Sequence, residues 1–199
     1  QDRSSRISYW SCHETLPRSS RCQIRHPAYH SKTKMTGIKE RNINVAVECF
    51  VKKDGKYLML HRHSTKKMMP NVWMAPGGKR DFNEGLFACA KREILEETGL
   101  EIKNLKIKVA GNAYIEDLNL ELYFHFLTAE WAGGELTPET EVGELAWHTP
   151  EEISKLDNLL AELREVLPHV FADDDKVISY TAVYKSGNEM VEFSLENPK

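Results

Sequence analysis

The feature that most limits the fold is one helical segment, residues 85–98, set between stretches that alternate like strands. In residues 118–129, for example, apolar side chains fall on one face with a period of two, namely Leu118, Leu120, Leu122, Phe124 and Phe126. Strands are expected at residues 44–51, 57–61, 101–115, 118–129, 145–148, 177–184 and 190–195. Strands interleaved with helices predict an α/β domain with a mixed sheet.

Turn and cap residues set the expected boundaries of these elements. Residues 53–56, Lys-Asp-Gly-Lys, are typical of a hairpin turn. We expect long loops at residues 64–84 and around Gly133-Gly134. Thr149 followed by Pro150 predicts the start of a second helix, which we expect to run to about Val166.

The inner face of the helix at residues 85–98 is apolar. Phe87, Ala90 and Ile94 share one arc at about 100° per residue, so we expect them to pack inward. Gly99 stands where a helix end needs a left-handed residue. The pattern therefore predicts a helix whose last turn lies beside the core.

Three acids, Glu93, Glu96 and Glu97, lie within an arc of about 100° near the end of this helix. Like charges at this spacing destabilise a helix by about 0.2–0.5 kcal/mol, and the helix C-terminus also disfavours anions. A divalent cation would relieve this repulsion, and carboxylates suit Mg²⁺ or Mn²⁺. Arg92 is expected to reach Glu96 and Glu84 and so to orient the carboxylates. The alternative is an ordinary solvated acidic helix end.

The spacing of the whole segment separates these alternatives. It is Gly78, five residues, Glu84, seven residues, Arg92-Glu93, Ile94, one residue, Glu96-Glu97, one residue, Gly99 and Leu100. Seven such exact matches arise by chance at a rate on the order of 10⁻⁸ per start position. The segment resembles the signature of the Nudix hydrolase superfamily, with looser similarity over residues 42–195. The resemblance implies an α/β/α sandwich with a mixed β-sheet.

The resemblance also implies a reaction, the Mg²⁺-dependent hydrolysis of a nucleoside diphosphate linked to another group. By the family pattern Glu93, Glu96 and Glu97 would bind the metal, and Glu93 would also orient or deprotonate water. Gly77 and Gly78 would let the backbone approach the phosphates.

Other residues could support this chemistry. Arg62, at the end of a strand, and Lys79, beside the glycine pair, are candidate phosphate-binding cations; each is otherwise a solvated charge. Family members often supply a further carboxylate from a later loop, for which we favour Glu141, with Glu144 next. The alternative is a flexible acidic loop.

The substrate is less constrained. Residues 71–79 and the hairpin at 180–195 look like the oxidised-purine triphosphatases of the MutT type, which release a nucleoside monophosphate and pyrophosphate. Trp73 would line a base pocket or else pack in the core. The chain departs from the mammalian branch, which has Asn where Met74 stands and paired aspartates where only Glu162 is found. Alternatives are hydrolysis of a sugar, dinucleotide or cap diphosphate, a Nudix-fold isomerase, and a non-catalytic regulatory module.

Bulk properties narrow the partners. The formal net charge of −3 gives no reason to expect a stable nucleic-acid partner. No apolar run approaches the ~18 residues of a membrane span. Four cysteines without a C-x-x-C pair suggest free thiols in a reducing compartment, so we expect a cytoplasmic protein that is a monomer or a homodimer.

Residues 1–34 differ from the rest of the chain. Seven basic residues and only two acids give this leader a charge of +5, which leaves −8 for the remainder. It reads as a disordered or cloning-derived extension, a targeting peptide, or a basic binding arm. We expect the Nudix domain to occupy residues 35–199.

Overall fold

The computed structural model describes residues 42–196. The interpretations of the leader and of a domain start at Met35 lie outside these residues. The elements in chain order are β1 (Asn42–Lys53), β2 (Lys56–Arg62), β3 (Trp73–Met74), α1 (Leu86–Thr98), β4 (Leu100–Ile115), β5 (Leu120–Gly134), β6 (Gly143–His148), α2 (Pro150–Ile153), α3 (Ala161–Val170), β7 (Ile178–Tyr184) and β8 (Met190–Glu196).

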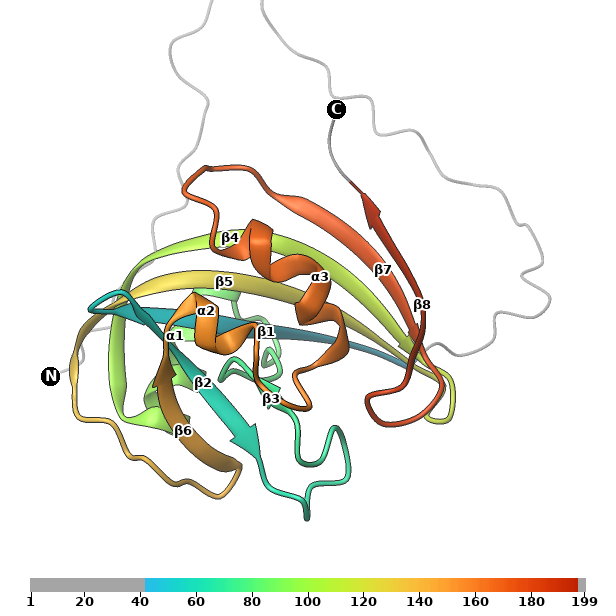
Figure 1. Ribbon diagram of the computed structural model, residues 1–199, viewed down its shortest axis with the longest axis horizontal. Coiled ribbons are helices and arrows are strands. Elements are labelled where there is room, and N and C mark those ends of the chain that lie inside the picture. The colour runs from blue at the N-terminus through green and yellow to red at the C-terminus, as the bar shows by residue number, and fades with distance from the viewer. Residues whose placement is uncertain (1–41, 197–199) are drawn as a thin grey trace, which may run out of the picture. The chain divides into compact units, whose positions relative to one another are not determined.

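The strands form one mixed sheet in the order β3-β2-β1-β5-β4-β7-β8, and β6 pairs with β2. The pairs β1–β5 and β4–β7 are parallel, and the other pairs are antiparallel. Figure 1 shows β4 and β5 as two long strands that curve across the middle of this sheet. The predicted mixed sheet is confirmed.

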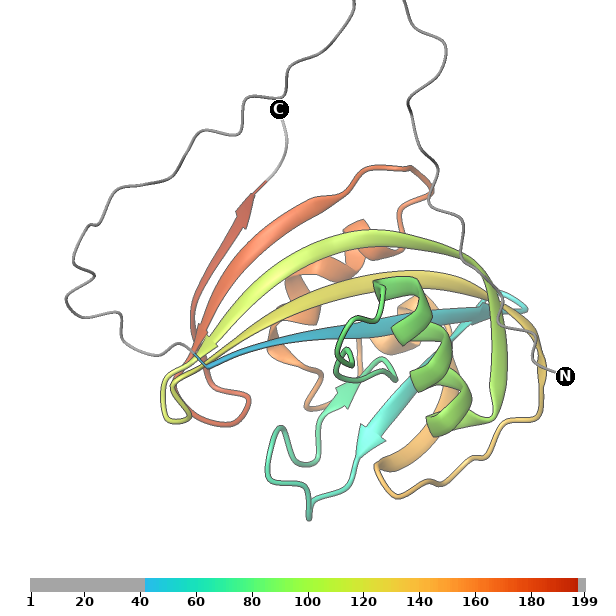
Figure 2. The same ribbon diagram turned by 180° about the vertical axis from the view of Figure 1, so that it is seen from behind.

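Helices cover both faces of the sheet, as the α/β/α prediction requires. Figure 1 shows α2 and α3 in front of the sheet, and Figure 2 shows α1 on the opposite side. The strand β1 separates two apolar cores because successive side chains point to opposite faces. Val47 and Cys49 pack with Ile94 of α1, whereas Phe50 packs with Leu163 of α3.

The local signals in the turns and caps are confirmed. Asp54 and Gly55 both have positive φ, 50° and 76°, as a tight hairpin requires. Thr149 caps α2 through a reciprocal capping box with Glu152, and Pro150 begins the helix.

The prediction of one helix from Pro150 to about Val166 is wrong. The chain forms α2, leaves the helical path, and starts again as α3. Asn158 has a φ of 52°, its carbonyl accepts from the Trp73 N–H at 3.0 Å, and the Leu160 N–H donates to the Trp73 carbonyl at 2.9 Å. These hydrogen bonds to β3 replace the helical ones, so a tertiary contact overrides the local pattern.

Three smaller expectations are also wrong. Phe87 is 47% exposed, and Cys89 takes the inward position beside Ala90 and Ile94. Leu118 is 50% exposed because it lies in the turn before β5. Gly133-Gly134 belongs to β5 rather than to a loop, since both residues pair with the start of β4.

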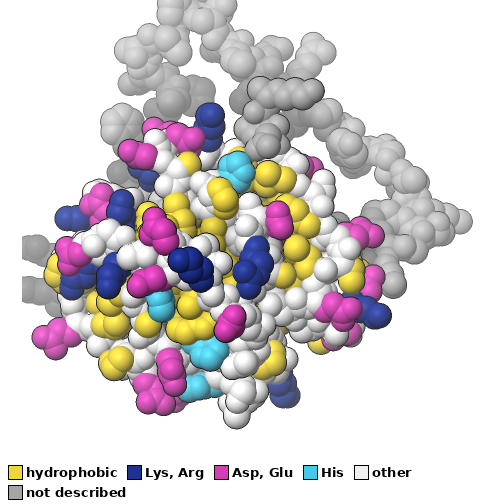
Figure 3. Space-filling model, in the orientation of Figure 1, with side chains coloured by type: hydrophobic (Ala, Val, Ile, Leu, Met, Phe, Trp, Pro, Cys, Tyr) yellow, Lys and Arg dark blue, Asp and Glu magenta, His cyan; other side chains and the backbone are white. Residues whose placement is uncertain are grey.

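The thiols, the surface charges and the helix lengths of residues 42–196 bear on the remaining expectations. Cys49 and Cys89 are buried free thiols. In Figure 3, the face that carries α2 and α3 shows basic and acidic side chains intermixed with apolar ones. None of the helices described here has the length and apolarity needed to cross a bilayer.

Candidate active site

The last two turns of α1 lie against the loop that contains Gly77 and Gly78. The helix ends at Gly99, whose φ of 74° lets its N–H donate to the carbonyl of Leu95. Buried Ala90 and Ile94 fix the rotation of the helix. That rotation turns Glu93 and Glu97 toward the loop, while the side chain of Glu96 stays 60% exposed.

The two glycines permit this close approach. The Gly77 N–H donates to Oε2 of Glu97 at 3.1 Å. A Cβ placed on Gly78 would overlap the Glu93 carboxylate, and one on Gly77 would overlap the backbone of Val47. The loop is also tied to β1, because the Val47 N–H donates to the Gly78 carbonyl at 2.9 Å. Larger residues would therefore separate the loop from both the helix and the sheet.

Arg92 holds the carboxylates in place, as expected. Its guanidinium donates to both oxygens of Glu84, at 3.0 and 2.9 Å, and to Glu93 at 2.7 Å and Glu96 at 3.2 Å. It also donates to the carbonyl of Lys79 at 3.1 Å. The hydrogen bonds from Arg92 lower the pKa of Glu84 to about 2. One side chain thus connects the glycine loop with three acids.

Glu97 is in a different electrostatic environment. Burial raises its pKa to about 7, the Gly77 N–H opposes that shift, and the charge of Glu93 adds to it. Arg62 and Lys66 lower its pKa by smaller amounts. Arg62 and Lys66 act on this carboxylate from a distance, and within residues 42–196 it forms no direct ion pair.

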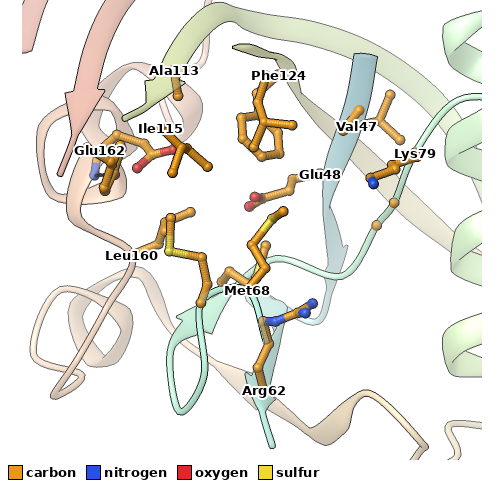
Figure 4. Close-up of a pocket in the computed structure, with 17 residues that line it drawn as sticks. Val47, Glu48, Arg62, Met68, Lys79, Ala113, Ile115, Phe124, Leu160 and Glu162 are labelled. Carbon is orange, nitrogen blue, oxygen red and sulfur yellow. Dashed lines mark hydrogen bonds between the residues drawn. The ribbon is translucent and has the colours of Figure 1, made fainter. Parts of the chain in front are cut away.

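A cavity borders the same glycine loop on the side away from α1. Figure 4 shows it between β1, β4, β5 and the segment leading into α3. Four predicted residues line it, namely Arg62, Gly77, Gly78 and Lys79. Most of the remaining wall is apolar and includes Met68, Phe124 and Leu160. The cavity has a volume of about 150 Å³ and lies beside the phosphate-binding candidates.

Trp73, proposed from sequence as a base-pocket residue, does not line this cavity. Its indole stacks on His61 at 4.7 Å between ring centroids and meets His148 edge-on at 5.3 Å. The next residue, Met74, lines the cavity instead. This arrangement agrees with the alternative of a packing role for Trp73.

Of the two loop acids, Glu141 lies nearer the helix carboxylates. It lines a shallow hollow with Glu96, Glu97 and Thr140. Glu144 is in β6, opposite His61, and does not line that hollow. The structure thus brings Glu141, but not Glu144, to the cluster.

Comparisons with known proteins agree with this geometry. The NUDIX domain family matches residues 41–170, about two thirds of the chain. The chain belongs to the Nudix family. It is similar to the mutator MutT protein of Bacillus halodurans, with a TM-score of 0.67, 26% identity, and coverage of 76% of this chain and 97% of that one.

Two curated Nudix relatives have named activities. The m7GpppN-mRNA hydrolase NUDT17 of Xenopus laevis is 32% identical over 98 residues, which is 48% of this chain and 33% of that protein. The 8-oxo-dGTP diphosphatase of Buchnera aphidicola subsp. Schizaphis graminum is 33% identical over 90 residues, 45% of this chain and 65% of that protein. The match therefore spans less than two thirds of either relative.

Nudix enzymes typically depend on a divalent metal ion, and the donors here fit one in part. Glu93 and Glu97 supply hard oxygen ligands that converge on the same glycines, and the pKa of the partly buried Glu97 is raised even though Arg62 and Lys66 oppose the shift. Glu96 instead points outward to Arg92. Within residues 42–196, no three Asp, Glu, His or Cys side chains are already close enough to enclose an ion. Binding would require Glu96 or another donor to turn inward.

Sequence reasoning missed one acid in this Nudix domain. Glu48, in the middle of β1, is 1% exposed and lines the cavity. Its signal was a charged residue in the apolar run Val45–Val51, because an unpaired acid is rarely buried. Glu162, noted from sequence only as a departure from the mammalian branch, lines the same cavity.

Proposed function

We propose that this Nudix protein hydrolyses a nucleoside triphosphate, ordinary or oxidised, to the monophosphate and pyrophosphate. The observation that carries the proposal is that the glycine loop contacts Glu93 and Glu97 on one side and borders a mostly apolar cavity on the other. Such a loop suits a nucleotide with its base in the cavity and its phosphates over Gly77-Gly78. The similarity to MutT and to the Buchnera diphosphatase supports this choice.

In this proposal Glu93, Glu96 and Glu97 hold Mg²⁺, or Mn²⁺ in its place. The ion would neutralise phosphate charge and lower the pKa of bound water. Arg92 is a positioning residue, since it contacts Glu93 and Glu96 rather than the cavity. The similarity of these carboxylates to hard-metal ligand sets supports the assignment.

The chain's own residues would carry out the remaining steps. Arg62 and Lys79, at the cavity, would bind phosphate oxygens and stabilise the negative charge of the reacting phosphate. A water molecule attacks phosphorus, and Glu93 or Glu141 accepts its proton as the phosphoanhydride bond breaks. Pyrophosphate leaves while the monophosphate stays on the base side.

A second candidate is hydrolysis of an X-linked diphosphate such as an mRNA cap. The similarity to the Xenopus cap hydrolase favours it. Both candidates use the same carboxylates. They differ in the group attached to the second phosphate, which is a third phosphate in a nucleoside triphosphate and the group X in the other substrates.

A substrate panel with Mg²⁺ separates the two candidates. We expect pyrophosphate and a monophosphate from nucleoside triphosphates, detected by anion-exchange chromatography. Cleavage restricted to cap analogues, dinucleotides or nucleotide sugars would favour the second candidate. No turnover of any nucleotide with Mg²⁺ or Mn²⁺ would overturn both. Preferential hydrolysis of an oxidised triphosphate in this panel would support a role in cleaning the cytoplasmic nucleotide pool.

A further inference from the structure

Glu141 lies at the tip of a tight turn between β5 and β6. The base of the turn is closed by an isolated bridge between Glu139 and Glu144. Nearer the tip, the N–H and the hydroxyl of Thr140 both donate to the Gly143 carbonyl, at 2.9 and 3.2 Å. Glu139 and Glu144 therefore belong to the two arms of the turn, whereas Glu141 belongs to its tip.

The carboxylate of Glu141 depends on this turn for its position. The side chain is exposed, and within residues 42–196 it has no hydrogen bond or ion pair. It nevertheless lines one hollow with Glu96 and Glu97 of α1. A site carried on a loop needs supporting contacts to be placed precisely. The contacts that hold the turn therefore decide where the carboxylate lies.

The segment that leads into the turn is attached to the end of α1. The Thr137 N–H donates to the carbonyl of Thr98, the last residue of the helix, at 3.1 Å. The next residue, Gly99, permits this approach, because a Cβ there would lie 2.8 Å from the carbonyl oxygen of Glu135. This attachment fixes the start of the segment relative to the helix that carries the proposed metal ligands.

His63 holds the turn on both sides of Glu141. It directly follows β2, and β6 begins beside the end of β2 because the two strands are antiparallel. The His63 backbone N–H donates to the Val142 carbonyl at 3.0 Å. Its ring Nε2 lies 3.0 Å from the carbonyl oxygen of Thr140, 77 positions away. A carbonyl oxygen can only accept, so Nε2 carries the proton and donates it. One residue thus binds both neighbours of Glu141.

We propose that His63 is a positioning residue, which holds Glu141 beside the end of α1 so that its carboxylate accepts the proton of the attacking water. The proposal rests on the proposed function, in which Glu141 is one of two candidate proton acceptors. His63 binds backbone carbonyls rather than the acid, so it places Glu141 and leaves the carboxylate free to accept a proton. His63 is not among the described residues that line the cavity, so its effect should be on the rate rather than on substrate binding.

Substitution of His63 tests this role. His63→Ala removes the ring donor and keeps the backbone donor. It should lower kcat about 10-fold, because the turn loosens, and leave KM within about 2-fold. His63→Gln should recover most of the rate, since its side-chain amide can donate to the Thr140 carbonyl. Steady-state kinetics with Mg²⁺ on dGTP, 8-oxo-dGTP and a cap analogue measure both. Wild-type kcat in His63→Ala, or a change in KM alone, would overturn the proposal.

A matched variant controls for general effects of changing this loop. Thr65→Ala shortens an exposed side chain two positions further along and should keep the wild-type kcat and KM. Circular dichroism of each variant shows whether it is folded. A loss in Thr65→Ala as large as that in His63→Ala would show that any change in the loop has this effect, and would overturn the proposal.

A double substitution shows whether His63 acts through Glu141. Glu141→Gln alone should lower kcat by ~10²-fold, the usual contribution of a proton acceptor. Once that carboxylate is absent, His63→Ala should lower kcat by less than about 2-fold more, because residues that act together are not additive. A further loss of about 10-fold would mean that His63 acts by another route. Wild-type kcat in Glu141→Gln would also overturn the proposal.

Hydrogen exchange tests the attachment without turnover. The backbone N–H groups of Thr140 and Val142 are bonded within the turn, to the Gly143 carbonyl and to the Thr140 hydroxyl. In His63→Ala both should exchange about 5-fold faster, the effect of losing one hydrogen bond from a locally opening unit. The capped N–H of Glu152 is an internal reference that should not change. Unchanged exchange in the turn would contradict the proposal.

The kinetic results also separate this proposal from the proposed function. If triphosphates are hydrolysed and His63→Ala keeps the wild-type kcat, the positioning role fails and the proposed function stands. If only the cap analogue is cleaved and the effect of His63→Ala depends on Glu141, the proposed substrate fails and the positioning role stands.

Discussion

The backbone N–H of Gly77 and the carboxylate of Glu97 are hydrogen-bonded at 3.1 Å across twenty positions of sequence. This contact joins the glycine loop to the helix that carries the proposed metal ligands. We expect Glu97→Gln and Glu93→Gln each to lower kcat/KM by ~10²-fold or more, because both remove a negative ligand. Steady-state kinetics with circular dichroism checks this, with exposed Glu101→Gln as the control. Wild-type turnover in either variant would show that the site is misassigned.

Arg92 donates hydrogen bonds to three carboxylates and a carbonyl at once. Lysine keeps the charge but cannot reproduce this fork of hydrogen bonds. Arg92→Lys should therefore lower kcat about 10- to 100-fold. It should also weaken Mg²⁺ binding, so that the Mg²⁺ concentration at half-maximal rate rises. An unchanged Mg²⁺ requirement would argue that Arg92 does not position these ligands.

Gly78 permits the close approach of the loop to Glu93. In Gly78→Ser the new Cβ would overlap that carboxylate, so activity should fall at least ~10-fold. Gly85→Ser is a matched control, because a Cβ there meets nothing within 4 Å and Ser is a favourable helix N-cap. Equal activity of the two variants would rule out the steric explanation.

Buried Glu162 should make stability depend on pH. Burial raises its folded pKa to about 7 from the usual 4.5 of a glutamate, so the folded state binds more protons between these values. The free energy of unfolding should then fall as pH rises from about 4.5 to 7, by at most ~1.4 kcal/mol per pH unit from this group. Urea unfolding of the wild type and of Glu162→Gln checks this. The variant should show a shallower slope, and identical slopes would contradict it.

The basic leader is not expected to take part in catalysis. A chain that begins at Met35 should keep kcat and KM within about 2-fold of the full sequence, since the residues proposed for the site lie between 48 and 162. A large loss of activity in the shortened chain would instead support the basic-arm interpretation.

Elements with local signals were predictable from sequence. The hairpin at Asp54-Gly55 and the caps at Thr149 and Gly99 depend on residues a few positions apart, and all formed as expected. The contacts of Arg92 with Glu84 and Glu96 were also expected, since they follow from the loop length and from helix geometry. These features need no knowledge of the rest of the fold.

Features that depend on distant contacts were not predictable in the same way. The break between α2 and α3 depends on hydrogen bonds to Trp73, more than eighty positions earlier. The exchange of Trp73 for Met74 at the cavity depends on the pairing of β3 with β2. The burial of Glu48 at the cavity was not predictable, because the cavity forms only when distant elements, among them the helix that carries Glu162, come together.

The backbone of Trp73 has a consequence for changing the substrate preference of this protein. It joins the segment leading into α3 to the strand that precedes the glycine loop through two hydrogen bonds, and the Asn158 side chain adds a third by donating to the carbonyl of Asn71, so these bonds hold the two sides of the cavity together. Suppose that residues 158–162 alone were exchanged for those of a relative. The backbone of the new segment would then be out of position at the cavity, and so would its side chains. Successful exchange of specificity between relatives should therefore require both segments to be transplanted together.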